Sequence, residues 1–227
     1  MEWYMRYDGQ VFISFSGGKD STVLLDLARR VYPDIPAVYV DTGLEYEGVI
    51  FTDGATEVVY YNQLDERWAD LPYGTDNIGG YGCGPTSMAI VVSSLTDQTV
   101  DPPTMAEWAY QNGYWCSGNG SYHSLIPGAA EGFGLQWESI STDDPQAVVD
   151  ALASRKLIVA LMSKGHFTSS GHFMVLRGVT SEGKILVADP ASKKRSEQEW
   201  DILALSSGNI VNGTTAVTVK FNIPERE

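Results

Sequence analysis

The residue with the clearest chemical potential is Cys83, which stands between two glycines and is followed directly by a helical pattern. Pro85 suits the first turn of a helix, because its missing N–H would have no partner there. A thiol at a helix start faces unpaired N–H groups and the positive end of the helix dipole, which favour the thiolate. The spacing predicts a nucleophile just before a buried helix, with the flanking glycines leaving room for a substrate backbone. The apolar face of this helix is expected at Met88, Val91, Val92 and Leu95.

A base and a group to orient it are found in a predicted hairpin. His172 opens an apolar run at residues 172–176, and a second run at 184–190 contains Asp189. Ser-Glu-Gly at 181–183 is a turn signal, so the two runs are predicted to pair as antiparallel strands. A tight loop that pairs residue 179 with 184 sets residue 174 opposite Asp189. His172 and Asp189 then become diagonal neighbours on one face, where a carboxylate can orient an imidazole.

A possible oxyanion donor precedes the cysteine. Gln63 lies in residues 60–68, which are predicted to form a short strand that runs into a polar turn. Its side-chain N–H, together with the backbone N–H of Cys83, could stabilise the oxyanion of a tetrahedral intermediate. A cysteine, a histidine, an aspartate and such a donor supply the groups needed for acyl transfer.

Four motifs follow one another in the order Tyr-Asn-Gln-x-Asp, Gly-Cys-Gly-Pro-Thr-Ser, Gly-His-Phe and Asp-Pro. Residues 57–221 thereby resemble the papain-like cysteine peptidases related to the bacteriocin-leader-processing, double-glycine proteases. The resemblance implies an α+β papain-like fold and a peptide or protein substrate, with no cofactor and no metal. It implies Cys83 as nucleophile, His172 as general base, Asp189 as orienter and Gln63 as oxyanion donor. A peptidoglycan-peptide hydrolase is an alternative, because papain-like domains also cut cell-wall peptides.

Other residues compete for these roles. Cys116 has no helix behind it and is interpreted as structural. His123 and His166 compete with His172, but the following strand and the aspartate partner favour His172, and His166 is expected in a loop or in the substrate cleft. A zinc site from Cys83, His166 and His172 would lack the close ligand pairs of such sites. Five aromatic residues either line a substrate groove or pack between two halves of the fold: Trp108, Tyr110, Tyr114, Trp115 and Tyr122.

The front of the chain carries a different pattern. Strand-like runs at 11–15 and 35–40 flank a helical run at 22–30, and the first strand leads into a loop made of Ser16, Gly17, Gly18, Lys19, Asp20 and Ser21. A glycine turn that opens a helix can bind phosphate. This loop and residues 40–46 resemble the PP-loop of the phosphoadenylyl-sulfate (PAPS) reductase family, over residues 1–47. Two strands and one helix supply at most half of a doubly wound nucleotide crevice, so we expect a vestigial β-α-β fragment of a PP-loop α/β fold. A nucleotide-binding or reductase-like function is the third alternative.

Composition limits the remaining classes. The 227 residues are 43% hydrophobic and 19% charged, a balance typical of a folded protein. Three segments are predicted: the PP-loop segment at 1–47, a junction at 48–56 and the peptidase domain at 57–227. The net charge of −14 argues against a nucleic-acid or anionic-membrane partner. As written, the sequence has neither a signal peptide nor a run of about 18 apolar residues, so we expect a cytoplasmic protein.

Overall fold

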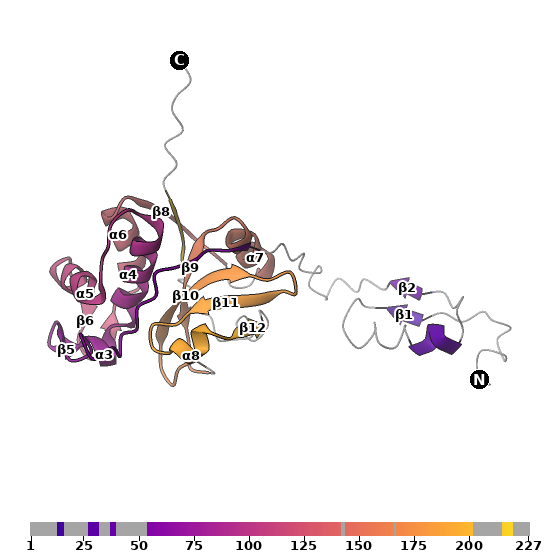
Figure 1. Ribbon diagram of the computed structural model, residues 1–227, viewed down its shortest axis with the longest axis horizontal. Coiled ribbons are helices and arrows are strands. Elements are labelled where there is room, and N and C mark those ends of the chain that lie inside the picture. Colours follow the sequence, from indigo (N-terminus) through magenta and orange to yellow (C-terminus); the bar gives the residue numbers. More distant parts are fainter. Residues whose placement is uncertain are drawn as a thin grey trace, which may run out of the picture. The chain divides into compact units, whose positions relative to one another are not determined.

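A computed structural model of the chain describes residues 13–15, 27–31, 37–39, 54–141, 144–165, 167–201 and 215–219 (Figure 1). The chain divides between Val49 and Ile50 into two compact units. This division falls in the stretch 48–56, which the sequence predicts as a junction. None of the helices among the described residues is long and apolar enough to cross a membrane.

The first unit contains two strands with a helical turn between them. β1 (Ile13–Phe15) pairs in parallel with β2 (Ala37–Tyr39), and residues 27–31 are helical. Parallel neighbours need a crossover connection, which the helical segment supplies. The predicted strand-helix-strand order is therefore present, whereas the loop at 16–21 lies outside the described residues.

A mixed-length antiparallel sheet forms one part of the second unit. Its order is β12-β11-β10-β9-β13-β8, and β3 pairs additionally with β10. β9 reads Leu-Ile-Val-Ala-Leu-Met and is buried throughout, because helices and other strands cover it. The two residues of β3 lie in the predicted junction. The strands are β3 (Gly54–Ala55), β8 (Leu135–Ser139), β9 (Leu157–Met162), β10 (His172–Val179), β11 (Lys184–Ala188), β12 (Glu199–Asp201) and β13 (Thr215–Val219).

Helices and short hairpins form the other part of this unit (Figure 1). α4 contacts α5, α6 and β10 and therefore lies at the centre. Met88, Val91 and Val92 are buried as the sequence predicts, and Leu95 is partly buried. Burial extends beyond this one face, because residues 84–92 are all buried and this part of the helix is enclosed on every side. These elements are β4 (Pro72–Tyr73), β5 (Asp76–Asn77), α3 (Ile78–Tyr81), α4 (Cys83–Leu95), α5 (Pro102–Gln111), β6 (Trp115–Cys116), β7 (Gly120–Ser121) and α6 (Leu125–Gly132), while α7 (Pro145–Ala153) and α8 (Lys193–Ser196) accompany the sheet.

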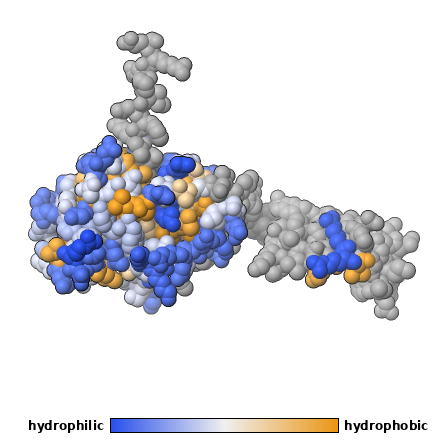
Figure 2. Space-filling view, viewed as in Figure 1, coloured by the Kyte–Doolittle hydropathy of each residue, from blue (hydrophilic) through white to orange (hydrophobic). Residues whose placement is uncertain are grey.

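Aromatic packing holds the helical part together. Trp108 stacks on Tyr114 with ring centroids 5.6 Å apart, and Tyr110 meets Trp115 edge-on at 5.6 Å. Four of the five aromatic residues that the sequence singled out thus pack in two pairs, while Tyr122 is exposed, as is Tyr110 in part. On the face shown in Figure 2, hydrophobic residues of the second unit form small areas among hydrophilic ones.

Candidate functional site

Cys83 is the first residue of α4, one position later in the helix than the sequence predicts. The residue before it, Gly82, caps the helix. The backbone N–H groups of Gly84 and of Phe173 in β10 are directed at the Cys83 sulfur and favour its thiolate, which lowers the pKa of the thiol. Cys83 is half-buried, so the sulfur is held by the protein and still borders a cavity.

The two glycines beside Cys83 serve packing and not the substrate, contrary to the sequence-based interpretation. A Cβ on Gly82 would lie 2.5 Å from the carbonyl oxygen of Ile78. A Cβ on Gly84 would lie 2.7 Å from the Ser121 hydroxyl. Both glycines therefore let other parts of the protein approach the start of α4 closely.

The hairpin that carries His172 and Asp189 is present. Its pairing differs from the prediction near the turn and agrees with it near His172 and Asp189. Val179 lies opposite Ile185, so the predicted pairing of 179 with 184 was wrong by one residue. A bulge between Leu176 and Gly178 absorbs the difference, and Val175 lies opposite Ala188. That alignment is the one that follows from setting residue 174 opposite residue 189.

The three polar side chains are connected in series. His172 Nε2 lies 2.8 Å from Asp189 Oδ1. The imidazole also hydrogen-bonds to Cys83, and since Nε2 faces the carboxylate, its Nδ1 must face the thiol. His172 is 7% exposed and Asp189 is fully buried. The structure therefore brings together Cys83, His172 and Asp189, as the sequence predicts.

This arrangement changes the acidity of both reactive groups. Burial alone would lower the pKa of His172, but the hydrogen bonds to Asp189 and Cys83 raise it from the ordinary 6.5 to about 9. Burial alone would raise the pKa of the Cys83 thiol, but the hydrogen bond and charge of His172 lower it overall, with help from the N–H groups on the sulfur. Both directions favour a thiolate beside an imidazolium.

Gln63 is buried and bridges the two segments that carry these groups. Its backbone N–H donates to the carbonyl of Pro190, next to Asp189, at 2.7 Å. Its side-chain Nε2 donates to the carbonyl of Gly79, four residues before Cys83, at 2.8 Å. The surrounding residues 60–68 form turns and irregular structure, so the short strand predicted there is not present.

A cleft of about 350 Å³ opens beside Cys83 and His172. Sequence reasoning missed its other walls, which come from residues 80–81, from 118–121 just before and within β7, from Leu161 in β9 and from residues 170–171. His123, treated above only as a competitor, also lines the cleft and lies edge-on to Phe173 at 5.9 Å. Gly171 lines the cleft and has open space where a Cβ would stand.

The remaining predicted residues lie elsewhere or cannot be placed. Cys116 is half-buried in β6 and is not disulfide-bonded. His166 and the PP-loop residues 16–21 lie outside the described residues. Across the described residues, no group of three or more His, Cys, Asp and Glu side chains could hold a metal ion.

Comparisons with known proteins agree with both resemblances seen in the sequence. A model of the Peptidase_C39 like family matches residues 55–209. A model of the phosphoadenosine phosphosulfate reductase domain matches residues 10–67, farther than the predicted 1–47. The two matches overlap at 55–67, where the backbone N–H of Thr56 donates to Arg177 in β10 and that of Gln63 donates to Pro190, just beyond β11.

The solved structures to which this chain is similar have low sequence identity to it. The chain is similar to a double glycine motif protease from an AMS/PCAT transporter, solved in complex with the leader peptide, with 17% identity, 74% of this chain and 94% of that chain covered, and a TM-score of 0.46. The chain is also similar to a putative C39-like peptidase from Bacillus anthracis, with 15% identity, 75% of this chain and 98% of that chain covered, and a TM-score of 0.46. An uncharacterized protein of Methanocaldococcus jannaschii is 51% identical over 37 residues, which are 16% of this chain and 9% of that protein. The chain thus spans only a small part of that relative.

Proposed function

Because this chain belongs to the Peptidase_C39 like family, we propose that it is a cysteine peptidase that hydrolyses peptide bonds through Cys83. The observation that carries the proposal is the linked series of Cys83, His172 and Asp189 beside an open cleft. A nucleophile, a base in contact with it and a carboxylate that orients the base are the parts that acyl transfer requires.

The reaction begins with attack of the Cys83 thiolate on the carbonyl carbon of the substrate. His172 then gives its proton to the leaving amine, and the acyl group remains on sulfur as a thioester. A water molecule attacks the thioester while His172 takes its proton. The carboxylic acid product leaves, and the thiolate and imidazolium form again.

Gln63 is the proposed oxyanion donor. Its amide nitrogen has two N–H groups, and the bond to Gly79 uses one of them. Gly80, next to that acceptor, lines the cleft, so the amide is held near the cleft wall. The second N–H, together with the backbone N–H of Cys83, would stabilise the negative oxygen of the tetrahedral intermediate.

The substrate is proposed to be a peptide or protein segment in extended conformation. The cleft offers little side-chain bulk at Gly80, Gly118, Gly120 and Gly171, which leaves room for a peptide backbone. The peptidase domain is proposed to comprise residues 57–227, with 1–47 as a reductase-like segment and 48–56 as the junction.

The proposal is tested by mass spectrometry after incubation with a diverse peptide library. We expect cleavage by the natural chain and by Cys116→Ala, and none by Cys83→Ala. Cleavage that persists in Cys83→Ala would refute the role of this cysteine. Release of cell-wall peptides with no cleavage of linear peptides would instead favour a peptidoglycan-peptide hydrolase.

A further inference from the structure

The Asp189 side chain is bonded on both of its oxygens. Oδ1 accepts from His172 Nε2 and from the backbone N–H of Ala191, each at 2.8 Å. Oδ2 accepts from Arg195 Nε at 2.5 Å. The carboxylate is fully buried, whereas the Arg195 side chain is 28% exposed. Arg195 therefore closes the side of Asp189 that faces away from His172.

The backbone of Asp189 is fixed by the same neighbourhood. Its N–H donates to the hydroxyl of Ser196 at 2.8 Å, and its carbonyl accepts from the hydroxyl of Tyr60 at 2.9 Å. α8 thus contributes two consecutive residues, Arg195 and Ser196, to Asp189. The side chain of Ser192 caps α8 by accepting from the N–H of Arg195, so the orientation of the turn is set by the sequence itself.

The charges of the site alternate along this series. If Cys83 is a thiolate and His172 an imidazolium, then Cys83, His172 and the Asp189 carboxylate together carry one net negative charge. An unbalanced buried charge is strongly unfavourable. Arg195 adds the second positive group and makes the series neutral, which removes this obstacle to forming the thiolate.

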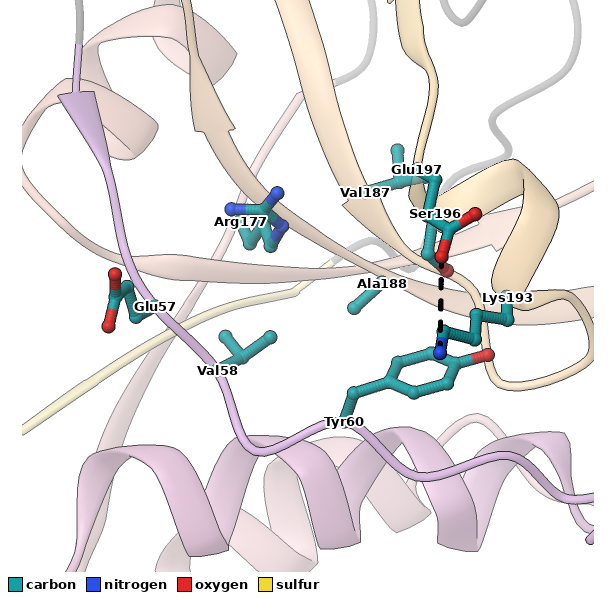
Figure 3. Close-up of a pocket in the computed structure, with 9 residues that line it drawn as sticks. All are labelled: Glu57, Val58, Tyr60, Arg177, Val187, Ala188, Lys193, Ser196 and Glu197. Carbon is teal, nitrogen blue, oxygen red and sulfur yellow. Dashed lines mark ion pairs between the residues drawn. The ribbon is translucent and has the colours of Figure 1, made fainter.

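Other charged side chains around α8 do not take this role. A cavity of about 400 Å³ lies beside Tyr60 and Ser196 and is lined by two acidic and two basic residues (Figure 3). Lys193 lies 4.0 Å from Glu197, and both are mostly exposed. Tyr60 is itself neutral, since burial in particular raises the pKa of its hydroxyl to about 12. The charged residues of this cavity are Glu57, Arg177, Lys193 and Glu197.

We propose that Arg195 is a fourth, positioning member of the site, which balances and orients the buried Asp189 carboxylate so that the Cys83 thiolate and the His172 imidazolium can exist together. This inference rests on the proposed function and assigns to the same site a residue that contacts neither the nucleophile nor the base. Burial works against ionisation of Asp189, but the hydrogen bonds from His172 and Arg195 lower its pKa overall, which fits this role.

The test measures the rate of Cys83 alkylation by iodoacetamide as a function of pH, by peptide mapping of the full chain. Arg195→Gln keeps a hydrogen-bond donor and loses the charge, whereas Arg195→Lys keeps the charge. Lys194→Gln is the matched control, because Lys194 is exposed on the same turn. Thermal unfolding verifies that each variant is folded. Arg195→Met is a second uncharged variant, and whichever uncharged variant folds carries the comparison.

In the uncharged Arg195 variant, the alkylation midpoint of Cys83 is expected to move to higher pH by about one pH unit. This is the low end of the range for a charge in direct contact, because Arg195 acts on the thiol through Asp189 and His172. At a pH below both midpoints, alkylation should be about tenfold slower. The pH profile of Cys83 alkylation in Arg195→Lys should lie close to that of the natural chain, and the profile of Lys194→Gln should be the same as that of the natural chain. A folded uncharged variant with an unchanged profile would overturn the proposal, as would an equal shift in Lys194→Gln. Alkylation needs no peptide substrate. A lack of peptide cleavage would therefore refute the proposed function, whereas the alkylation profiles would still test the role of Arg195.

Discussion

Replacing Asp189 by Asn tests how the site makes its imidazolium. Asn is close in shape and keeps an acceptor that can face His172 Nε2, but it carries no charge. The difference between the ordinary pKa of 6.5 and about 9 corresponds to about 3 kcal/mol in favour of the imidazolium. Burial works against that charge, so the hydrogen bonds that His172 makes with Asp189 and Cys83 must supply more than this net amount.

Loss of a neighbouring opposite charge commonly moves a pKa by 1 to 3 units, so we expect the pKa of His172 to fall by about 2 units in Asp189→Asn. The thiolate–imidazolium pair then becomes about 100-fold less favourable relative to the neutral thiol and imidazole. Activity at neutral pH should therefore fall by up to about 100-fold but remain measurable.

The assay is kcat/KM on a fluorogenic peptide between pH 5 and 10. In the natural chain, activity should rise as Cys83 ionises and fall as His172 loses its proton near pH 9, because the imidazolium is needed to protonate the leaving amine. In Asp189→Asn the alkaline decline should begin about 2 pH units lower. If the folded variant still declines near pH 9, Asp189 does not set the pKa of His172 and the reasoning fails.

Three further results are expected. Cys83 should be alkylated by iodoacetamide much faster than Cys116 at neutral pH, because its thiol pKa is lowered by His172; equal rates by peptide mapping would contradict the assignment. His172→Ala should abolish peptidase activity, whereas Gln63→Ala should retain turnover about 100- to 1000-fold below the natural chain, since one oxyanion donor is lost; equal loss in both variants would argue against these separate roles. Calorimetry should detect no tight ATP binding, because the front segment supplies only part of a nucleotide crevice, and tight binding that Lys19→Ala removes would show the opposite.

Local chemical signals were enough to predict the site’s core. The helix-start cysteine and the two apolar runs joined by a turn predicted where Cys83, His172 and Asp189 lie in these elements, because each signal depends on neighbouring residues. Their chemical roles stay predictions. The predicted strand register near His172 and Asp189 is confirmed, whereas the predicted pairing next to the turn was wrong by one residue. A one-residue shift would have moved His172 to the other face, and the bulge between Leu176 and Gly178 cancelled it.

The parts that could not be predicted depend on packing between distant segments. The burial of α4 on every side includes the polar residues Thr86 and Ser87, which lie outside the apolar face that the sequence predicts. Gly82 and Gly84 suggested substrate access, yet only the positions of Ile78 and Ser121 reveal that the space is already filled.

Arg195 illustrates the same limit at the site itself. In the sequence it is the last residue of a short basic run, and nothing distinguishes it from Lys193 and Lys194. α8 turns Arg195 inward to the buried carboxylate and leaves both lysines exposed. A hydrogen bond between charged groups is stronger than one between neutral groups, and Arg195 makes such a bond through Nε to Oδ2 of the buried Asp189. The position of an arginine shortly after an Asp-Pro pair therefore becomes informative only once the turn that carries it is known.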